Sequence, residues 1–116
     1  DGDLAGGRAE RDGLVDQVRR NAERHFSRLS TLRGLPQVRD VRGAGHMWGL
    51  EFAGAGARDG AAVACEVASR CFAAGLLVLQ ADNLIRINPP LVASDSEIEF
   101  VVETLCAAVR ETLAAS

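Results

Sequence analysis

The sequence predicts an α+β domain in which an antiparallel sheet of about three to four strands carries its helices mainly on one face. Helix-like and strand-like segments follow one another in the order αββαββα. The connections within each strand pair are short enough for hairpins, which makes paired strands antiparallel. The chain has 116 residues, 47% of them hydrophobic, which suits a single core.

The chain opens with a glycine- and charge-rich segment, residues 1–11, which we expect to be a linker or a frayed end. The folded domain is predicted over residues 12–116. Its first helix is amphipathic, because apolar side chains recur about every four residues among charged ones. These apolar side chains are Leu14, Val18, Ala22, Phe26 and Leu29. Gly34 and Pro36 are expected to end the helix.

Residues 38–52, VRDVRGAGHMWGLEF, contain two β-prone runs around a glycine-rich turn, which predicts a hairpin or a bent strand pair. Trp48, Leu50 and Phe52 alternate along the second run, so we assign them to the core. The region could suggest a phosphate-binding turn, but no GxGxxG sequence precedes a helix here, and a role in backbone geometry is the better interpretation. The residues concerned are Arg42, Gly43, Gly45 and Gly49.

Residues 53–60, AGAGARDG, are predicted to form a loop. A second helix is expected from about residue 59 to residue 74, and Gly75 is placed for a left-handed C-terminal cap. The face of this helix that we expect to be buried carries Val63, Val67, Cys71 and Phe72. The cysteines are odd in number and lack CxxC spacing, which favours reduced, buried thiols over disulfides or zinc. They are Cys65, Cys71 and Cys106.

Two short strands are predicted next, at residues 76–80 and 84–88, and the loop between them is short enough for a hairpin. Pro89 and Pro90 prevent further sheet pairing. Residues 94–97, SDSE, match a capping box, in which Ser94 and Glu97 satisfy each other's backbone, and predict the start of the last helix. Its apolar stripe consists of Ile98, Val101, Val102, Leu105, Val109 and Leu113.

Charge and composition exclude several classes of partner. The net charge is −3, and the thirteen basic residues form no basic run, so we expect neither nucleic acid nor a membrane surface as a partner. The apolar runs are far shorter than a membrane span. Unpaired cysteines suit a cytoplasmic protein. All thirteen basic residues are arginine, so chemistry that needs a lysine amine cannot be done by this chain alone.

Arg86 is the side chain that most needs an explanation, because it lies between Ile85 and Ile87 on a short apolar run. Burying an unpaired charge costs several kcal/mol. Strand alternation places the two isoleucines on the helix-covered face and turns Arg86 to the opposite face. The residues alone leave two interpretations open: Arg86 binds an anionic ligand, or it pairs with a local acid such as Glu51 or Asp82.

The remaining polar side chains offer weaker candidates. His25 and His46 are isolated and lack the partners of a catalytic base or a metal ligand, so we assign both to structure. Glu51 has no second acid positioned with it, and we expect it to orient a neighbour or to pair with an arginine. We therefore predict no catalytic, cofactor-binding or metal-ligating residue in this chain.

Three stretches, in this order and spacing, resemble the C-terminal small domain of class III pyridoxal-phosphate aminotransferases, of the ornithine, acetylornithine and 4-aminobutyrate type. They are residues 12–29, 38–52 and 73–105. The family pattern is a helix, a VRGxGxMxGxE-like strand, then GLLV, IRxxPPL and a final helix with an acidic cap. The resemblance extends from residue 12 to about residue 113. His46 and Trp48 depart from the pattern, because the family more often has aliphatic residues there.

The resemblance implies the small domain of a fold-type I enzyme and a homodimeric parent enzyme that uses pyridoxal phosphate. In that family the arginine of the IRxxPP segment commonly binds a substrate carboxylate, and Arg86 is the matching position. A planar guanidinium suits this task because it presents two parallel donors to two oxygens. The lysine that holds the cofactor lies on a large domain upstream, which would be the partner of this chain. The expected substrate is an amino acid or keto acid, and the isolated chain is expected to be inactive.

A second hypothesis is a free-standing, non-catalytic module with the same fold that binds a carboxylate ligand or a partner chain. Without a large domain, such a module would leave an apolar surface bare, and it would need a partner or self-association. We expect this surface around Leu76, Val78 and Leu84.

Overall fold

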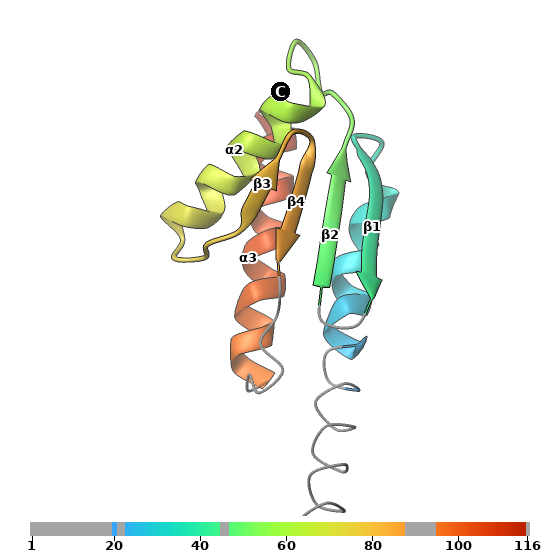
Figure 1. The fold of residues 1–116 in the computed structure, drawn as a ribbon, viewed down its shortest axis with the longest axis vertical. Coiled ribbons are helices and arrows are strands. Elements are labelled where there is room, and N and C mark those ends of the chain that lie inside the picture. The colour runs from blue at the N-terminus through green and yellow to red at the C-terminus, as the bar shows by residue number, and fades with distance from the viewer. Residues whose placement is uncertain (1–19, 21–22, 45–46, 88–94, 116) are drawn as a thin grey trace, which may run out of the picture.

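The computed structural model describes residues 20, 23–44, 47–87 and 95–115. Over these residues the chain has the expected α+β fold, with a four-stranded sheet in the order β1-β2-β4-β3 (Figure 1). The strands are β1 (Val38–Ala44), β2 (Met47–Phe52), β3 (Leu79–Ala81) and β4 (Leu84–Ile87). All three neighbouring pairs are antiparallel, so both predicted hairpins are confirmed.

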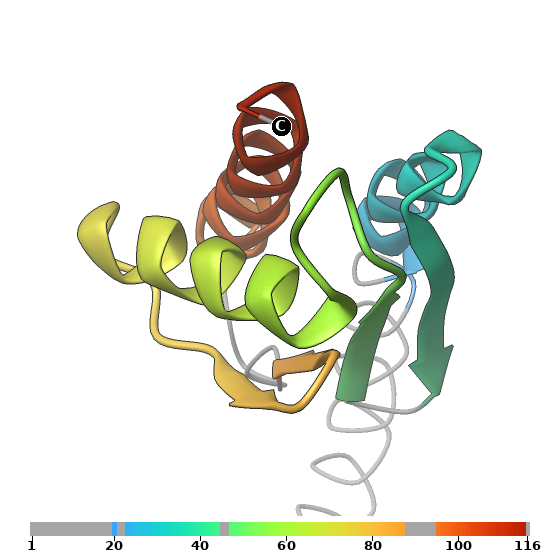
Figure 2. The same ribbon diagram turned by 90° about the horizontal axis from the view of Figure 1, so that it is seen from above.

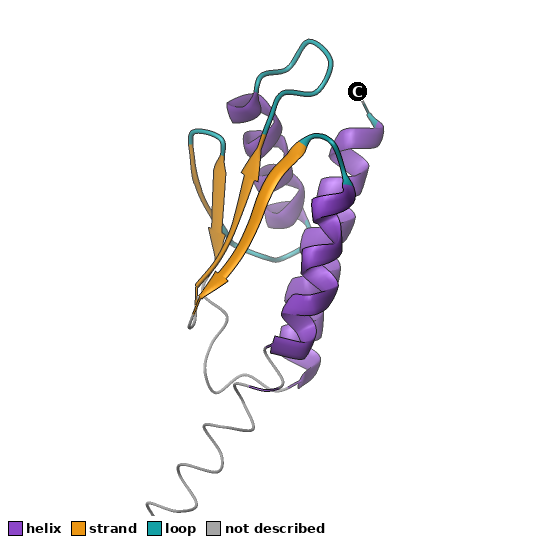
Figure 3. Cartoon of the chain, turned by 90° about the vertical axis from the view of Figure 1, so that its right-hand side faces the viewer, coloured by secondary structure: helices purple, strands orange, loops and turns teal. Residues whose placement is uncertain are grey.

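The helices cover one face of the sheet, and no described helix lies on the other face (Figures 2 and 3). Residues 23–29 are α-helical and continue into the 3₁₀ helix η1 (Ser30–Gly34), which packs against β1. The helix α2 (Gly60–Ala73) packs on β2, β3 and β4. The helix α3 (Asp95–Ala114) packs on α2. The sheet therefore has one covered, inner face and one outer face.

The core lies between the inner face of the sheet and these helices. Trp48, Leu50 and Phe52 of β2 are buried there, which confirms their assignment from the alternation. The Trp48 ring lies 5.7 Å from that of Phe26, centroid to centroid, so the first helix is tied to the sheet by aromatic packing. The helices contribute Leu29, Leu32, Val63, Val67, Cys71, Ile98, Val102, Leu105 and Val109 to the same core.

Both ends of α2 have the capping that its sequence predicts. At the N-terminus the Asp59 carboxylate accepts a hydrogen bond from the Ala62 N–H at 2.8 Å. At the C-terminus Gly75 has φ +94°, the left-handed conformation that glycine tolerates best. The Leu76 N–H donates to the Cys71 carbonyl at 2.8 Å, which completes a Schellman motif.

The strand predicted over residues 76–80 is shorter than expected, because only Leu79–Ala81 pairs with β4. The cap of α2 directs Leu76 inward, and the alternation that follows leaves Leu77 and Leu79 exposed, at 75% and 68%. The prediction of an exposed apolar surface around Leu76, Val78 and Leu84 is therefore wrong, since Leu76 is buried and the other two are half-buried.

Two side chains of α2 are also misplaced by the prediction. Phe72 is 70% exposed, because it follows the buried Cys71 and is rotated by about 100° around the helix. Cys65 is exposed for the same geometric reason, since it follows the buried Ala64. Cys71 is buried and Cys106 is half-buried, and all three cysteines are unbridged, as expected.

Some predictions concern residues outside the described part of the chain. These are the linker at residues 1–11, the start of the first helix with Leu14, Val18 and Ala22, the turn residues Gly45 and His46, Pro89, Pro90, and Ser94 of the capping box. Within the described ranges, no helix combines the length and the apolar character needed to cross a membrane.

Candidate functional site

Arg86 lies in the middle of β4 with its side chain on the outer face of the sheet. Ile85 is fully buried and Ile87 is 7% exposed, whereas Arg86 is exposed. This is the alternation that the sequence predicts. The guanidinium therefore avoids the cost of burial while its two neighbours anchor β4 in the core.

A row of residues crosses the outer face at the level of Arg86. Arg86 is paired in register with Gly49 of β2 on one side and with Leu79 of β3 on the other. Gly49 is paired in turn with Arg42 of β1. A Cβ atom added at Gly49 would have only the Ile85 carbonyl oxygen within 4 Å, at 3.8 Å, so the space beside Arg86 is open. Met47, two residues before Gly49, is 46% exposed.

Neither acid considered as a structural partner of Arg86 pairs with it. Glu51 instead accepts from Arg42, with Oε1 2.8 Å from Nη2, and from Arg39, with Oε2 3.4 Å from Nη1. Asp82 lies in the turn between β3 and β4 with φ 53°. Among the residues that the structure describes, no side chain forms a hydrogen bond or ion pair with Arg86. Its two donor edges thus remain available on that face.

Cys71 and Cys106 do not show the features of activated nucleophiles. Burial raises the pKa of the Cys71 thiol from 9.0 to about 11, which leaves it protonated at neutral pH. Burial also raises the pKa of Cys106, although the charges of Arg110 and Arg28 act in the opposite direction. Among the described residues, no group of histidine, cysteine and acidic side chains could hold a metal ion. His25 is buried in the first helix, consistent with a structural role.

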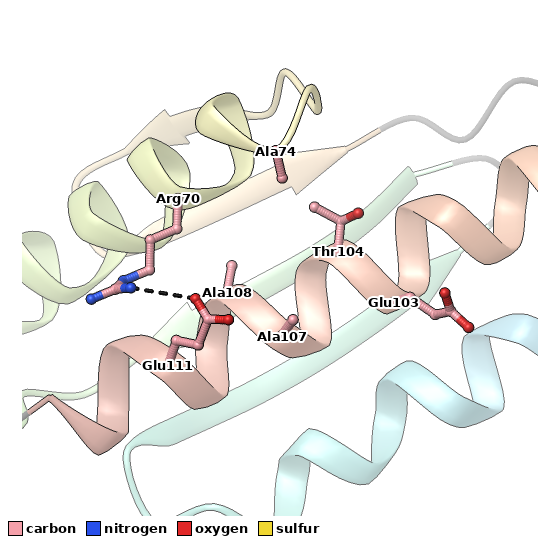
Figure 4. A pocket seen from close by; sticks show the side chains of 7 residues that line it. All are labelled: Arg70, Ala74, Glu103, Thr104, Ala107, Ala108 and Glu111. Atoms are coloured by element: carbon pink, nitrogen blue, oxygen red, sulfur yellow. Dashed lines mark hydrogen bonds and ion pairs between the residues drawn. The ribbon is translucent and has the colours of Figure 1, made fainter.

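A hollow of about 220 Å³ lies between α2 and α3, and sequence reasoning did not find it (Figure 4). Arg70 lies at one end of it and pairs with Glu111 at 3.4 Å and with Glu66 at 3.8 Å, so its charge is matched within the chain. The i,i+4 spacing of Glu66 and Arg70 was visible in the sequence, but the partner on α3 was not. The hollow is lined by Arg70, Ala74, Glu103, Thr104, Ala107, Ala108 and Glu111.

The fold occurs in transaminases of known structure. The omega transaminase of Pseudomonas jessenii, solved in complex with PMP, matches with a TM-score of 0.79 and 22% sequence identity. The match covers 91% of this chain and 24% of that enzyme. The architecture of this chain therefore occurs within a transaminase of known structure.

Sequence comparison gives the family. The model of the class-III aminotransferases matches residues 8–109. A probable aminotransferase of Mycobacterium tuberculosis is 31% identical over 113 residues, which cover 89% of this chain and 24% of the relative. The acetylornithine aminotransferase of Corynebacterium efficiens is 40% identical over 81 residues, 69% of this chain and 18% of the relative. The chain belongs to the class-III aminotransferase family, and it spans about a quarter or less of the length of these relatives.

Membership of the class-III aminotransferase family implies pyridoxal phosphate as the cofactor. The residues of this chain do not fit a covalent attachment of that group, since its thirteen basic residues are all arginine and it offers no lysine amine. The chain does offer the exposed guanidinium of Arg86 on the outer face of the sheet.

Proposed function

We propose that this chain is the C-terminal small domain of a class III pyridoxal-phosphate aminotransferase, and that Arg86 binds the substrate carboxylate. The observation that carries the proposal is the exposure of Arg86 on the outer sheet face, while Glu51 is occupied by the arginines of β1. A guanidinium in this state can donate two parallel hydrogen bonds to a carboxylate. The substrate class is an amino acid or a keto acid.

The parent enzyme divides its tasks between two domains. The large domain upstream supplies the lysine and holds the cofactor, which provides the electron sink for transamination. The small domain, residues 12–116 after a linker at residues 1–11, supplies Arg86 and one wall of the substrate cleft. The exposed Met47 and Leu79 on the outer face support this arrangement, because the large domain would cover them. The proposed enzyme is a cytoplasmic homodimer, and the isolated chain is inactive.

The role of Arg86 is tested by Arg86→Lys in the intact enzyme. A lysine keeps one positive charge but loses the bidentate geometry, so KM for the carboxylate substrate should rise and kcat/KM should fall by about one to three powers of ten. Steady-state kinetics and a thermal denaturation curve provide the measurement. Arg110→Lys, an exposed change on α3, is the matched control and should leave both unchanged. Unaltered kinetics in Arg86→Lys would refute the role.

The domain assignment is tested separately. The in-frame sequence upstream of Asp1 should encode a large domain with a lysine at a strand end. The 116-residue chain mixed with pyridoxal phosphate should show no transamination. If no such upstream domain exists, the chain is instead a free-standing carboxylate-binding or protein-interaction module, and the exposed Leu77 and Leu79 are where it would meet a partner.

A further inference from the structure

We propose that Arg42, assisted by Arg39, is a positioning residue for the substrate-binding arginine. It holds the Glu51 carboxylate on the β1 side of the sheet, and Arg86 is thereby left available for a substrate carboxylate. The inference rests on the proposed function of Arg86 and assigns a role to three residues that do not themselves touch the substrate.

The register puts Glu51 within reach of Arg86. Glu51 is paired with Leu84, and Arg86 lies two residues further along β4 on the same, outer face. Such diagonal neighbours in an antiparallel pair are about 7–8 Å apart, a distance that long side chains span. Gly49 is the register partner of Arg86 and follows Met47 on this face. It has no side chain that would separate Arg86 from Glu51. Glu51 is therefore an acid that could neutralise Arg86 internally.

The ion pairs between Glu51 and the arginines of β1 prevent Glu51 from pairing with Arg86. Both carboxylate oxygens of Glu51 are engaged, Oε1 by Arg42 at 2.8 Å and Oε2 by Arg39 at 3.4 Å. Arg42 is itself fixed by Asp40, whose Oδ2 lies 3.0 Å from its Nε. Asp40 thus orients Arg42, and Arg42 orients Glu51 away from β4. The Glu51 side chain is only 22% exposed, so it has less solvent to satisfy it than the arginines have.

Loss of Arg42 should convert Glu51 into a competitor of the substrate. A carboxylate paired internally with Arg86 must be displaced before a substrate carboxylate binds, and the apparent affinity falls by the fraction of enzyme that is competent. Exposed ion pairs are weak, so this fraction should fall by about two- to sixfold. The step after binding does not involve Glu51, and kcat should be nearly unchanged.

The test is a double-mutant cycle in the intact enzyme, with KM and kcat measured for a carboxylate substrate. Arg42→Ala should raise KM about two- to sixfold. Glu51→Gln alone should leave KM unchanged or slightly lower, and Arg42→Ala combined with Glu51→Gln should restore the wild-type KM. Arg28→Ala removes an arginine that pairs with Glu99 and Glu103 on the helical side, and it should have no effect on KM.

The outcomes separate this inference from the function on which it rests. If Arg86→Lys leaves KM unchanged, the carboxylate role of Arg86 is refuted and the inference with it. If Arg86→Lys raises KM but Arg42→Ala does not, only the positioning role is overturned. The positioning role is also overturned if the double variant keeps the raised KM of Arg42→Ala, because the rise in KM is then not caused by Glu51.

Discussion

At the scale of single residues, Gly43 shows how closely the first helix approaches the sheet. A Cβ atom added there would lie 2.6 Å from Cε1 of the Phe26 ring, which real contacts do not reach. That ring is in turn packed against Trp48. The glycine therefore serves backbone approach, as the sequence predicts, and the aromatic pair fills the space that a side chain would need.

Gly43→Ala should consequently destabilise the chain. The Phe26 ring must shift from its place against Trp48, and such overpacking costs about 1–3 kcal/mol of the free energy of unfolding. Urea denaturation followed by tryptophan fluorescence measures this directly. Gly49→Ala is the matched control, because its Cβ would meet only one atom at 3.8 Å, and it should change stability by less than about 0.5 kcal/mol. Equal losses in the two variants would contradict the steric explanation.

The candidate site was predictable in one respect and not in another. Arg86 alternates with two isoleucines along β4. If the strand turned Arg86 inward, both isoleucines would face solvent and their core contacts would be lost, so the exposure of Arg86 follows from the sequence. The partners of Glu51 do not follow from any local pattern. Arg39 and Arg42 are three apart and would face opposite sides of a regular strand, but the register shifts between Val38 and Asp40, and both arginines then reach Glu51.

At the scale of elements, the end of α2 determines how the chain enters the second hairpin. Gly75 in the left-handed conformation lets the Leu76 N–H bond to the Cys71 carbonyl. This turn determines which side chains of the following strand face the core and which face solvent. The resulting exposure of Leu79 sets the apolar neighbour of Arg86 on β3.

Gly75→Ala should therefore weaken the domain. An alanine at φ +94° is strained, and the expected loss is about 1–2 kcal/mol of the free energy of unfolding. The nearest atom to the added Cβ is Phe100 Cζ at 4.0 Å, so the loss is conformational rather than steric. Gly34→Ala, where a Cβ meets nothing within 4 Å, is the control for chemical denaturation. A Gly75→Ala variant as stable as Gly34→Ala would argue against the cap.

The elements themselves were largely predictable, whereas their exact pairing was not. Capping residues and apolar periodicity locate α2 correctly to within a residue or so, because Asp59 and Gly75 act through local backbone geometry. The apolar run at residues 76–80 has no local signal for where strand pairing begins. β3 is an edge strand whose only partner is β4, so the extent of β3 depends on how far β4 reaches.

At the scale of the whole molecule, the helices cover one face of the sheet (Figure 3), and the outer face carries the row formed by Arg42, Gly49, Arg86 and Leu79. The side of the sheet on which no described helix lies also carries the exposed Met47 and Leu79. A domain built in this way buries its core on the helical side of the sheet and leaves the sheet side open to a partner, as the proposed packing of a small domain on a larger one requires.

The protonation of the core provides a test of this architecture, because the chain contains neither lysine nor tyrosine. Few groups other than cysteines titrate between pH 9 and 11. The pKa of Cys71 is raised from 9.0 in the unfolded chain to about 11 in the folded one, so the folded state binds the proton more tightly. The contribution of the protonated Cys71 thiol to the free energy of unfolding is complete below pH 9 and is lost as the pH rises through 11.

The free energy of unfolding of the 116-residue chain should accordingly fall by about 2–3 kcal/mol between pH 9 and pH 11, since one pKa unit corresponds to about 1.4 kcal/mol. Urea titrations at several pH values measure the slope. Cys71→Ala should be less stable at pH 8 but should lose much less between pH 9 and 11, while Cys65→Ala, at an exposed position, should retain the wild-type slope. A slope that disappears in Cys65→Ala and persists in Cys71→Ala would place the titrating thiol outside the core and contradict the burial of Cys71 between α2 and the sheet.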